Sequence, residues 1–245
     1  MPARALIAMR RLTLIVLGVV AVVAIALGVA LRGWDDHGVT SAEGGRPEVA
    51  LTFDDGLNGE TTLAVAALLE RRGAHGTFFV VGSTLAAQRT VATRLIDGGH
   101  LLANHSETHE RASAWDVRYG TLDAAQVSIR SVTGRCPAYF RPPFGAETPF
   151  MKAAVRRAGL RTVLWDVEVA DWEEADAQRL AARVLERMRP GSIVLLHDGA
   201  DGLPGADRAT LLRALPAILD GIEARGWRAV RVDALLGEPG YRDGC

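Results

Sequence analysis

Two adjacent carboxylates, Asp54 and Asp55, follow an apolar run at residues 49–53 and precede Gly56. The run is typical of a buried strand, so the pair is expected at the end of that strand. A buried carboxylate is costly unless it is paired or binds a cation, and two neighbouring carboxylates repel each other. Asp-Asp-Gly is also ordinary turn chemistry. The pair is therefore either a solvated turn or a site at which a cation compensates the charge.

Two histidines, His105 and His109, stand four residues apart. On a helical turn, side chains at this spacing share a face, so two imidazoles could bind one cation. One aspartate would complete a set of three protein ligands and leave positions open for water and substrate. The other aspartate could then act as a general base on metal-activated water. The alternative is a solvated helix start that happens to carry two histidines.

Further polar residues could complete an acid–base site. Arg141 precedes two prolines that stiffen the backbone, and its guanidinium could hold the base carboxylate ionised and oriented. His197 follows an apolar run and could act as general acid, with Asp171 available as the partner of its second ring nitrogen. Trp172 could form a wall of the pocket, although core packing is the commoner fate of tryptophan.

The elements that must position these residues alternate along the chain between strand-like and helix-like segments. Continuous apolar strands with amphipathic helices between them predict a parallel sheet covered on both faces, either open or closed into a barrel. The carboxyl ends of parallel strands meet on one rim, so the polar residues that follow them are expected to converge. The predicted strands are 49–53, 77–81, 101–103, 139–141, 162–165, 193–196 and 227–232.

Composition limits the possible functions. Hydrophobic residues make up 49% of the chain, which supports a large core, and the net charge of −1 argues against an electrostatic nucleic-acid binder. Cys136 and Cys245 are the only cysteines. In an exported protein they could form a disulfide, but the sequence does not show their separation in space.

The N-terminal segment predicts export. Residues 12–31 carry no charged side chain, and three arginines precede them. About 20 apolar residues are needed to cross a bilayer, and the basic flank favours a cytoplasmic N-terminus. We expect a cytoplasmic N-terminus and transmembrane signal-anchor at 1–32, an extracellular stalk at 33–46 and a catalytic domain at 47–245. That places the domain outside the cell membrane; secretion after signal cleavage is the alternative.

Over about residues 47–233, the sequence resembles the polysaccharide deacetylase family, the NodB-homology domain of carbohydrate esterase family 4. The resemblance implies an α/β fold, a distorted (β/α) barrel of about seven strands. It also implies removal of acetyl groups from N-acetylglucosamine polymers or from acetylated xylan. The motifs that carry the resemblance are Thr-Phe-Asp-Asp-Gly at 52–56, His-Ser-Glu-Thr-His at 105–109, Arg-Pro-Pro-Phe-Gly at 141–145, Asp-Trp at 171–172 and Leu-Leu-His at 195–197.

The resemblance assigns roles to the matching residues. It implies that Asp54 is the catalytic base and that Arg141 positions it. It implies that the metal ligands are Asp55, His105 and His109. The metal would be one divalent ion, Zn²⁺ in the first place, with Co²⁺ or another divalent ion as the alternative.

The resemblance also implies that the backbone N–H of Phe144 helps to hold the oxyanion. Trp172 and Leu195 would line the slot for the acetyl methyl group. His197 would be the general acid, tuned by Asp171. The family often has aspartate at the position of Glu168, so the sequence leaves open whether Asp171 or Glu168 orients that histidine.

These observations predict a metal-dependent enzyme that removes N-acetyl groups from an acetylated polysaccharide, with cell-wall peptidoglycan or chitooligosaccharide as the expected substrate. Two other functions fit the same residues. One is an esterase acting on O-acetyl xylan, and the other is a catalytically inactive glycan-binding module.

Overall fold

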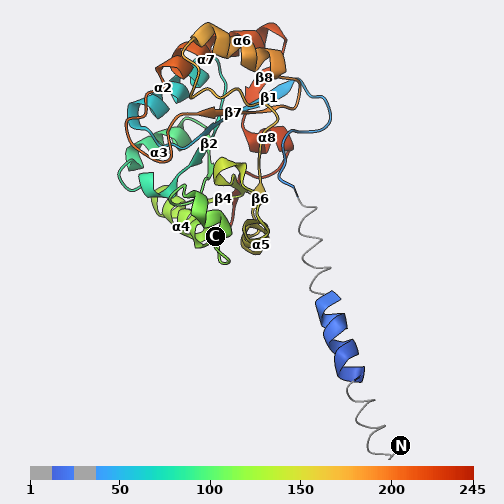
Figure 1. The fold of residues 1–245 in the computed structure, drawn as a ribbon. Coiled ribbons are helices and arrows are strands. Elements are labelled where there is room, and N and C mark those ends of the chain that lie inside the picture. The colour runs from blue at the N-terminus through green and yellow to red at the C-terminus, as the bar shows by residue number, and fades with distance from the viewer. Residues whose placement is uncertain (1–12, 25–36) are drawn as a thin grey trace, which may run out of the picture. The chain divides into compact units, whose positions relative to one another are not determined.

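The computed structural model describes residues 13–24 and 37–245, which divide into two units at His37–Gly38 (Figure 1). In the first unit, residues 13–24 are helical and their large hydrophobic side chains are exposed. No helix within the described residues has both the length and the hydrophobicity that a membrane crossing needs. The predicted anchor at 12–31 is described only over 13–24, and the rest of it lies outside the described residues.

The second unit is built on a seven-stranded sheet in the order β6-β5-β3-β2-β1-β7, with β8 also paired to β1. Every pairing within this sheet is parallel. The predicted parallel α/β sheet is therefore confirmed. Its strands are β1 (Glu48–Asp54), β2 (Thr77–Val80), β3 (Leu101–Asn104), β5 (Tyr139–Phe140), β6 (Arg161–Thr162), β7 (Ile193–His197) and β8 (Arg228–Val230).

Helices surround the sheet, as Figure 1 shows. Their buried faces carry aliphatic residues at helical spacing, which pack on the sheet. Short 3₁₀ turns lie at Gly82–Thr84, Arg111–Trp115 and Pro143–Gly145. The α-helices are α2 (Gly59–Glu70), α3 (Arg89–Asp97), α4 (Gly120–Thr133), α5 (Pro149–Ala158), α6 (Ala177–Arg187), α7 (Ala209–Ala224) and α8 (Val232–Leu236).

The sheet curls into a half-barrel with β6 and β7 at its edges. Only isolated bridges span the interval between these two strands in the described part of the chain. Backbone bonds tie residues 38–42, expected to belong to a stalk, onto the domain, which therefore begins at Gly38 rather than near Pro47. The bridging pairs are Val39 with Val163, Ser41 with Ser192 and Val167 with Val194.

Alternation along β1 decides where the acidic pair is placed. Leu51 and Phe53 face the main hydrophobic core under the helices, whereas Ala50 belongs to a second cluster inside the half-barrel. Successive side chains of a strand point to opposite faces, so Thr52 and Asp54 share the inner face with Ala50. The strand thereby carries a carboxylate into the interior of the half-barrel.

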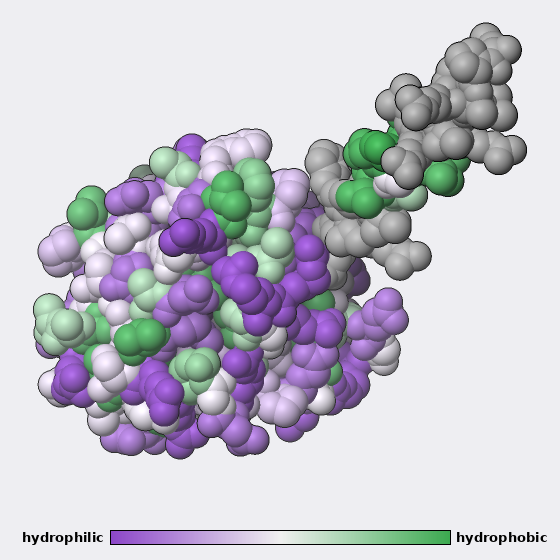
Figure 2. All heavy atoms as spheres, turned by 90° about the horizontal axis from the view of Figure 1, so that it is seen from below, coloured by the Kyte–Doolittle hydropathy of each residue, from purple (hydrophilic) through white to green (hydrophobic). Residues whose placement is uncertain are grey.

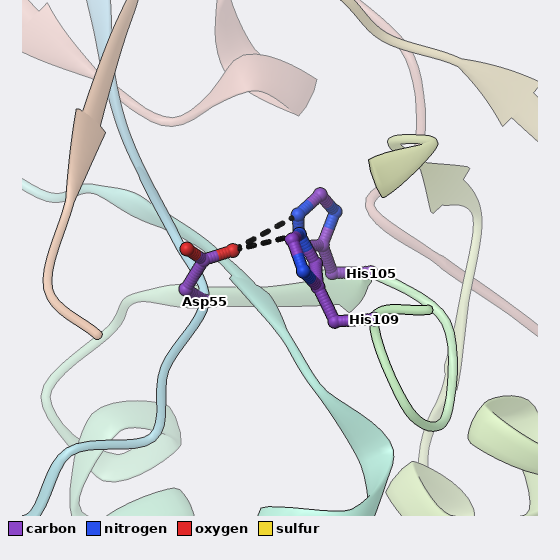
Figure 3. A group of neighbouring side chains, drawn as sticks. All are labelled: Asp55, His105 and His109. Atoms are coloured by element: carbon purple, nitrogen blue, oxygen red, sulfur yellow. Dashed lines mark ion pairs between the residues drawn. The ribbon is translucent and has the colours of Figure 1, made fainter. Parts of the chain in front are cut away.

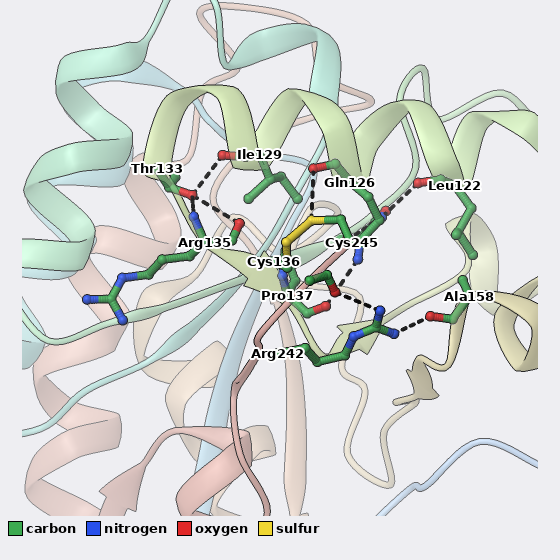
Figure 4. The surroundings of a disulfide bond; sticks show 12 residues. Leu122, Gln126, Ile129, Thr133, Arg135, Cys136, Pro137, Ala158, Arg242 and Cys245 are labelled. Atoms are coloured by element: carbon green, nitrogen blue, oxygen red, sulfur yellow. Dashed lines mark hydrogen bonds between the residues drawn. A yellow bond between two sulfur atoms is a disulfide. The ribbon is translucent and has the colours of Figure 1, made fainter.

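A disulfide joins Cys136 to Cys245, with the two Cα atoms 5.3 Å apart (Figure 4). It lies beside a second, antiparallel sheet of β4 (Cys136–Pro137) and β9 (Tyr241–Arg242), neither of which was predicted. The side-chain amide of Gln126 in α4 donates to the carbonyl of Pro137 at 3.1 Å. The pairing that the sequence left open is thus made, and it fixes the end of the chain to β4.

Figure 2 shows one face of the molecule, on which hydrophobic residues of the second unit are scattered among hydrophilic ones. Single exposed hydrophobic residues are normal on a soluble domain and need no partner. Two of the exposed aromatic residues, Phe144 and Trp172, are different because both line a pocket at the carboxyl ends of the strands.

Candidate active site

Asp55, His105 and His109 converge at the carboxyl ends of β1 and β3 (Figure 3). Oδ1 of Asp55 lies 3.3 Å from Nε2 of His105 and 3.0 Å from Nε2 of His109. Zinc bonds of about 2.0–2.1 Å at a tetrahedral angle place neighbouring ligand atoms about 3.3 Å apart. All three side chains are buried, and their donor atoms fit one divalent cation.

The loop that carries the histidines is not the helical turn that their spacing predicted. Residues 105–109 are irregular, and Ser106 and His109 adopt left-handed backbone conformations with φ of 68° and 54°. Local polar bonds form the loop instead, because Ser106 N donates to Oδ1 of Asn104 at 2.8 Å and His109 N donates to Oγ of Ser106 at 3.1 Å. Such side-chain-to-backbone bonds compete with helix formation.

A backbone carbonyl fixes the orientation of the first histidine. Nδ1 of His105 lies 2.8 Å from the carbonyl oxygen of Arg141. A carbonyl oxygen only accepts hydrogen bonds, so Nδ1 carries the proton and Nε2 has the free lone pair. An outer oxygen of this kind commonly orients a metal-binding imidazole. Burial opposes ionisation of Asp55, but when Nε2 of His105 and of His109 is also protonated, hydrogen bonds from both imidazoles hold the pKa of its carboxyl well below the usual range.

The neighbouring carboxylate, Asp54, is held by Arg141. The guanidinium Nη1 donates to Oδ1 of Asp54 at 2.6 Å and to Oγ1 of Thr52 at 2.8 Å. The rest of the guanidinium donates to the carbonyl oxygens of Val163 and Leu164. Arg141 is completely buried, so this salt bridge is formed away from water. The predicted contact between the arginine and one aspartate of the pair is confirmed.

His197 faces the same pocket from the end of β7, where its Cα pairs in register with that of Asp54. Its Nδ1 lies 2.8 Å from Oδ1 of Asp171, and its backbone N–H donates to Oδ2 of the same residue at 3.0 Å. Glu168 instead accepts a hydrogen bond from the indole N–H of Trp165 at 3.0 Å. The partner of His197 is therefore Asp171. Burial lowers the pKa of His197, but the hydrogen bond and charge of Asp171 outweigh burial and raise it above its ordinary value.

The walls of the pocket are hydrophobic and aromatic. The pocket has a volume of about 500 Å³, and Leu195, Trp172 and Phe144 line it together with the polar residues. The ring of Trp172 stands edge-on to that of His197, with centroids 4.8 Å apart. The centroids of the Phe144 and His109 rings lie 4.6 Å apart. The guanidinium of Arg111 lies over the Phe144 ring, with its Cζ 3.9 Å from the ring centroid. Every predicted site residue except Arg141 and Asp171 lines this pocket, and those two buried residues contact Asp54 and His197, which do line it.

Left-handed backbone conformations concentrate around this pocket. Asp55, His109, Phe144 and Asp201 line it, and each has a φ between 50° and 69°. Such values are uncommon for residues other than glycine and cost free energy, so they persist where the surrounding structure imposes them. Strained backbone of this kind gathers at functional sites, which agrees with the convergence of polar side chains here.

Four further residues line the pocket that the sequence did not single out: Trp165, Ala200, Asp201 and Arg208. Arg208 donates through its guanidinium to the carbonyl of Gly199, and Asp201 lies against His109. Both belong to the segment after β7, whose sequence Asp-Gly-Ala-Asp-Gly-Leu-Pro-Gly is that of an ordinary turn. No local signal in such a segment distinguishes a functional carboxylate from a solvated one.

Comparison with known proteins agrees with this geometry. The chain is 34% identical over 194 residues to a chitooligosaccharide deacetylase of Bradyrhizobium sp., which covers 75% of this chain and 88% of that protein. It is 31% identical over 193 residues to a peptidoglycan-N-acetylglucosamine deacetylase of Bacillus cereus, covering 77% of this chain and 87% of that protein. The crystal structure of the Bc1960 peptidoglycan N-acetylglucosamine deacetylase superposes with a TM-score of 0.77 at 26% identity, covering 83% of this chain and 94% of that one.

The sequence profile described as polysaccharide deacetylase matches residues 41–163, which include the acidic pair, both histidines and Arg141. Profile, relatives, half-barrel fold and pocket agree with one another, and the chain belongs to the polysaccharide deacetylase family.

Proposed function

We propose that this protein is a metal-dependent deacetylase that removes N-acetyl groups from N-acetylglucosamine residues of chitooligosaccharide or cell-wall peptidoglycan. The observation that carries the proposal is the division of the acidic pair. Asp54 is held by a buried arginine, whereas the adjacent Asp55 lies against two histidines. Relatives named as deacetylases of these two polymers support the choice of substrate.

Asp55, His105 and His109 would hold the cation, with Zn²⁺ expected first and Co²⁺ or another divalent ion as the alternative. When bound, a divalent cation supplies Lewis acidity to water and to the amide carbonyl. Asp54 takes the proton of the attacking water. Arg141 binds Oδ1 of that carboxylate and fixes its orientation, so Oδ2 is the oxygen that acts as base.

His197 gives its proton to the departing amine. The hydrogen bond between Nδ1 and Asp171 leaves Nε2 as the atom that carries the transferable proton. The raised pKa favours the protonated form of His197, which is the form that a general acid needs. The N–H of Phe144 stabilises the oxyanion. Trp172 and Leu195 shape the slot for the acetyl methyl group.

The enzyme acts outside the cytoplasm, held by a signal-anchor at residues 12–31, or released by cleavage of that segment. The uncharged sequence of this segment and the arginines before it support the proposal, as does the exposed hydrophobic helix at 13–24. The disulfide supports it too, because disulfides persist in oxidising compartments. Selective labelling of Cys136 and Cys245 in intact cells, before and after reduction, tests the location.

Acetate release by the full chain from peptidoglycan, chitooligosaccharide and acetylxylan tests the reaction and the substrate together. We expect release from one or both N-acetylated polymers, loss of release on chelation, and recovery when Zn²⁺ is added. Release from acetylxylan alone would establish the esterase instead. Binding to a polymer without release of acetate, in the presence of Zn²⁺, would establish the inactive binding module.

A further inference from the structure

The second histidine of the metal set, His109, has an outer neighbour to which neither the mechanism nor the family motifs assign a role. Oδ1 of Asp201 lies 2.7 Å from Nδ1 of His109. The imidazole is buried, whereas the carboxylate is 60% exposed. Among the described residues, Nδ1 of His109 is a buried ring nitrogen that makes no hydrogen bond. Asp201 is nevertheless the acceptor that lies within reach.

The chemistry of imidazole decides which atom needs this acceptor. Nε2 of His109 faces Asp55 and must be unprotonated to bind a cation, so Nδ1 carries the proton. A buried N–H without an acceptor is costly. For His105 the corresponding proton is accepted by the Arg141 carbonyl at 2.8 Å. A carboxylate in the same outer position on His109 would complete the pattern.

The turn that presents Asp201 is attached to the acidic pair itself. Gly199 N donates to the carbonyl of Asp54 at 3.3 Å, and Gly202 N donates to the carbonyl of Asp55 at 3.2 Å. Asp201 has φ of 50°, a left-handed conformation that aspartate and asparagine tolerate better than most residues. A side chain at position 202 would collide with Val81, so glycine is needed there. These backbone hydrogen bonds to Asp54 and Asp55 therefore hold the carboxylate of Asp201 beside the candidate cation site.

We propose that Asp201 is a positioning residue: its carboxylate accepts the Nδ1–H of His109 and orients Nε2 toward the cation site shared with Asp55 and His105. This inference rests on the proposed metal set. It adds a residue that does not bind the cation itself but orients one of the three ligands. An exposed aspartate that merely solvates a turn would not lie 2.7 Å from a buried imidazole nitrogen. The class of ligand served is a divalent cation with affinity for imidazole.

Zn²⁺ affinity, measured on the full chain by competition with a chelator, tests the proposal. Asp201→Ala and Asp201→Gly remove the acceptor, and we expect each to weaken Zn²⁺ binding by about 10–100-fold. Asp201→Asn keeps an acceptor oxygen and tolerates the left-handed backbone, so its affinity should stay within about threefold of wild type. In the Co²⁺-loaded protein, the visible absorption spectrum should change in the alanine and glycine variants and remain like that of wild type in the asparagine variant.

Asp207→Asn is the matched control, since Asp207 lies in the same segment, is exposed, and bonds only to the backbone N–H of Ala209 among its described contacts. Its Zn²⁺ affinity should equal that of wild type, and urea unfolding of every metal-free variant should remain a single cooperative transition, which shows that the domain still folds. If Asp201→Ala and Asp201→Gly both bind Zn²⁺ with wild-type affinity, the role proposed for Asp201 is wrong, and the proposed metal set is unaffected. Weak binding by Asp201→Ala combined with wild-type binding by Asp201→Gly would also overturn that role, because backbone strain would then be the cause. Failure of the wild type to bind Zn²⁺, or full retention of Zn²⁺ by Asp55→Ala, would overturn the metal set itself.

Discussion

Replacing Asp54 by asparagine separates the two roles proposed for the acidic pair. Asparagine has the same shape as aspartate, keeps an oxygen that can accept from Nη1 of Arg141, and cannot take a proton from water. Oδ2 of Asp54 lies 3.7 Å from Nε2 of His105, farther than Oδ1 of Asp55 at 3.3 Å. The variant should therefore lose the base and keep the metal site.

The contacts of Asp54 set the expected size of two effects of this substitution, the fall in kcat and the loss of folding stability. A positioned general base typically contributes about 10²–10⁴-fold, so kcat should fall by that factor, equivalent to about 2.7–5.4 kcal/mol of activation free energy. Deleting one partner of a buried ion pair costs about 3–5 kcal/mol of folding stability. Here the amide retains the hydrogen bond, and Arg141 keeps three other oxygen acceptors. The free energy of unfolding should therefore fall by less, about 1–3 kcal/mol.

The assay combines three measurements on wild type and Asp54→Asn: acetate release from chitooligosaccharide, bound Zn²⁺ per chain, and urea unfolding. We expect one Zn²⁺ per chain in both proteins, a native fold in both, and loss of turnover in the variant. Turnover within about fivefold of wild type would reject Asp54 as the base, since that is far below the effect of losing one. Loss of Zn²⁺ would show that Asp54 is a ligand and that the roles within the pair must be reassigned.

Three other expectations follow from the same contacts. Asp55→Ala should abolish stoichiometric Zn²⁺ binding, because it removes the one carboxylate oxygen that both histidines approach, and retention of Zn²⁺ on metal analysis would contradict the ligand set. Asp171→Asn should lower the pKa of His197 and move the alkaline limb of the kcat/KM pH profile to lower pH, because the acid is active when protonated. Glu168→Gln should leave that limb in place, and an equal shift in both variants would show that Asp171 is not the specific partner. Replacing Cys136 and Cys245 by serine should lower the free energy of unfolding in urea by about 4–5 kcal/mol, as loop-closure entropy gives for a sequence separation of 109; an unchanged midpoint would mean that the bond does not restrain the unfolded chain.

The sequence predicted those parts of the fold that depend on local pattern. The apolar runs at 49–53 and 193–196 correspond to β1 and β7 within one or two residues. Both strands are buried on two faces, so each reads as a continuous apolar run. Convergence of polar residues on one rim followed from parallel strands alone. Segments without such a pattern, β4 and β9, were missed because each is two residues long and pairs with a segment remote in the chain.

The loop at residues 105–109 shows where local reasoning fails. The spacing of the two histidines is that of one helical turn, and their side chains do meet, but through a different backbone. Asn104 and Ser106 accept hydrogen bonds from the backbone two and three residues ahead, which directs the chain away from a helix. This signal was present in the sequence as Asn-His-Ser. Asp201, in contrast, could be recognised only once the turn after β7 was placed beside β1.

The different roles of Asp54 and Asp55 follow from a change in backbone conformation between them. Asp54 is the last residue of β1, so the alternation of the strand directs it to the inner face, where Arg141 is buried. Asp55 has φ of 69°, which ends the strand and turns its side chain to the histidines instead. Continued strand geometry would have directed Asp55 to the opposite face, toward the core under the helices. A left-handed residue at a strand end thus allows two adjacent carboxylates to face one pocket with different partners, which is what base and metal ligand require of them.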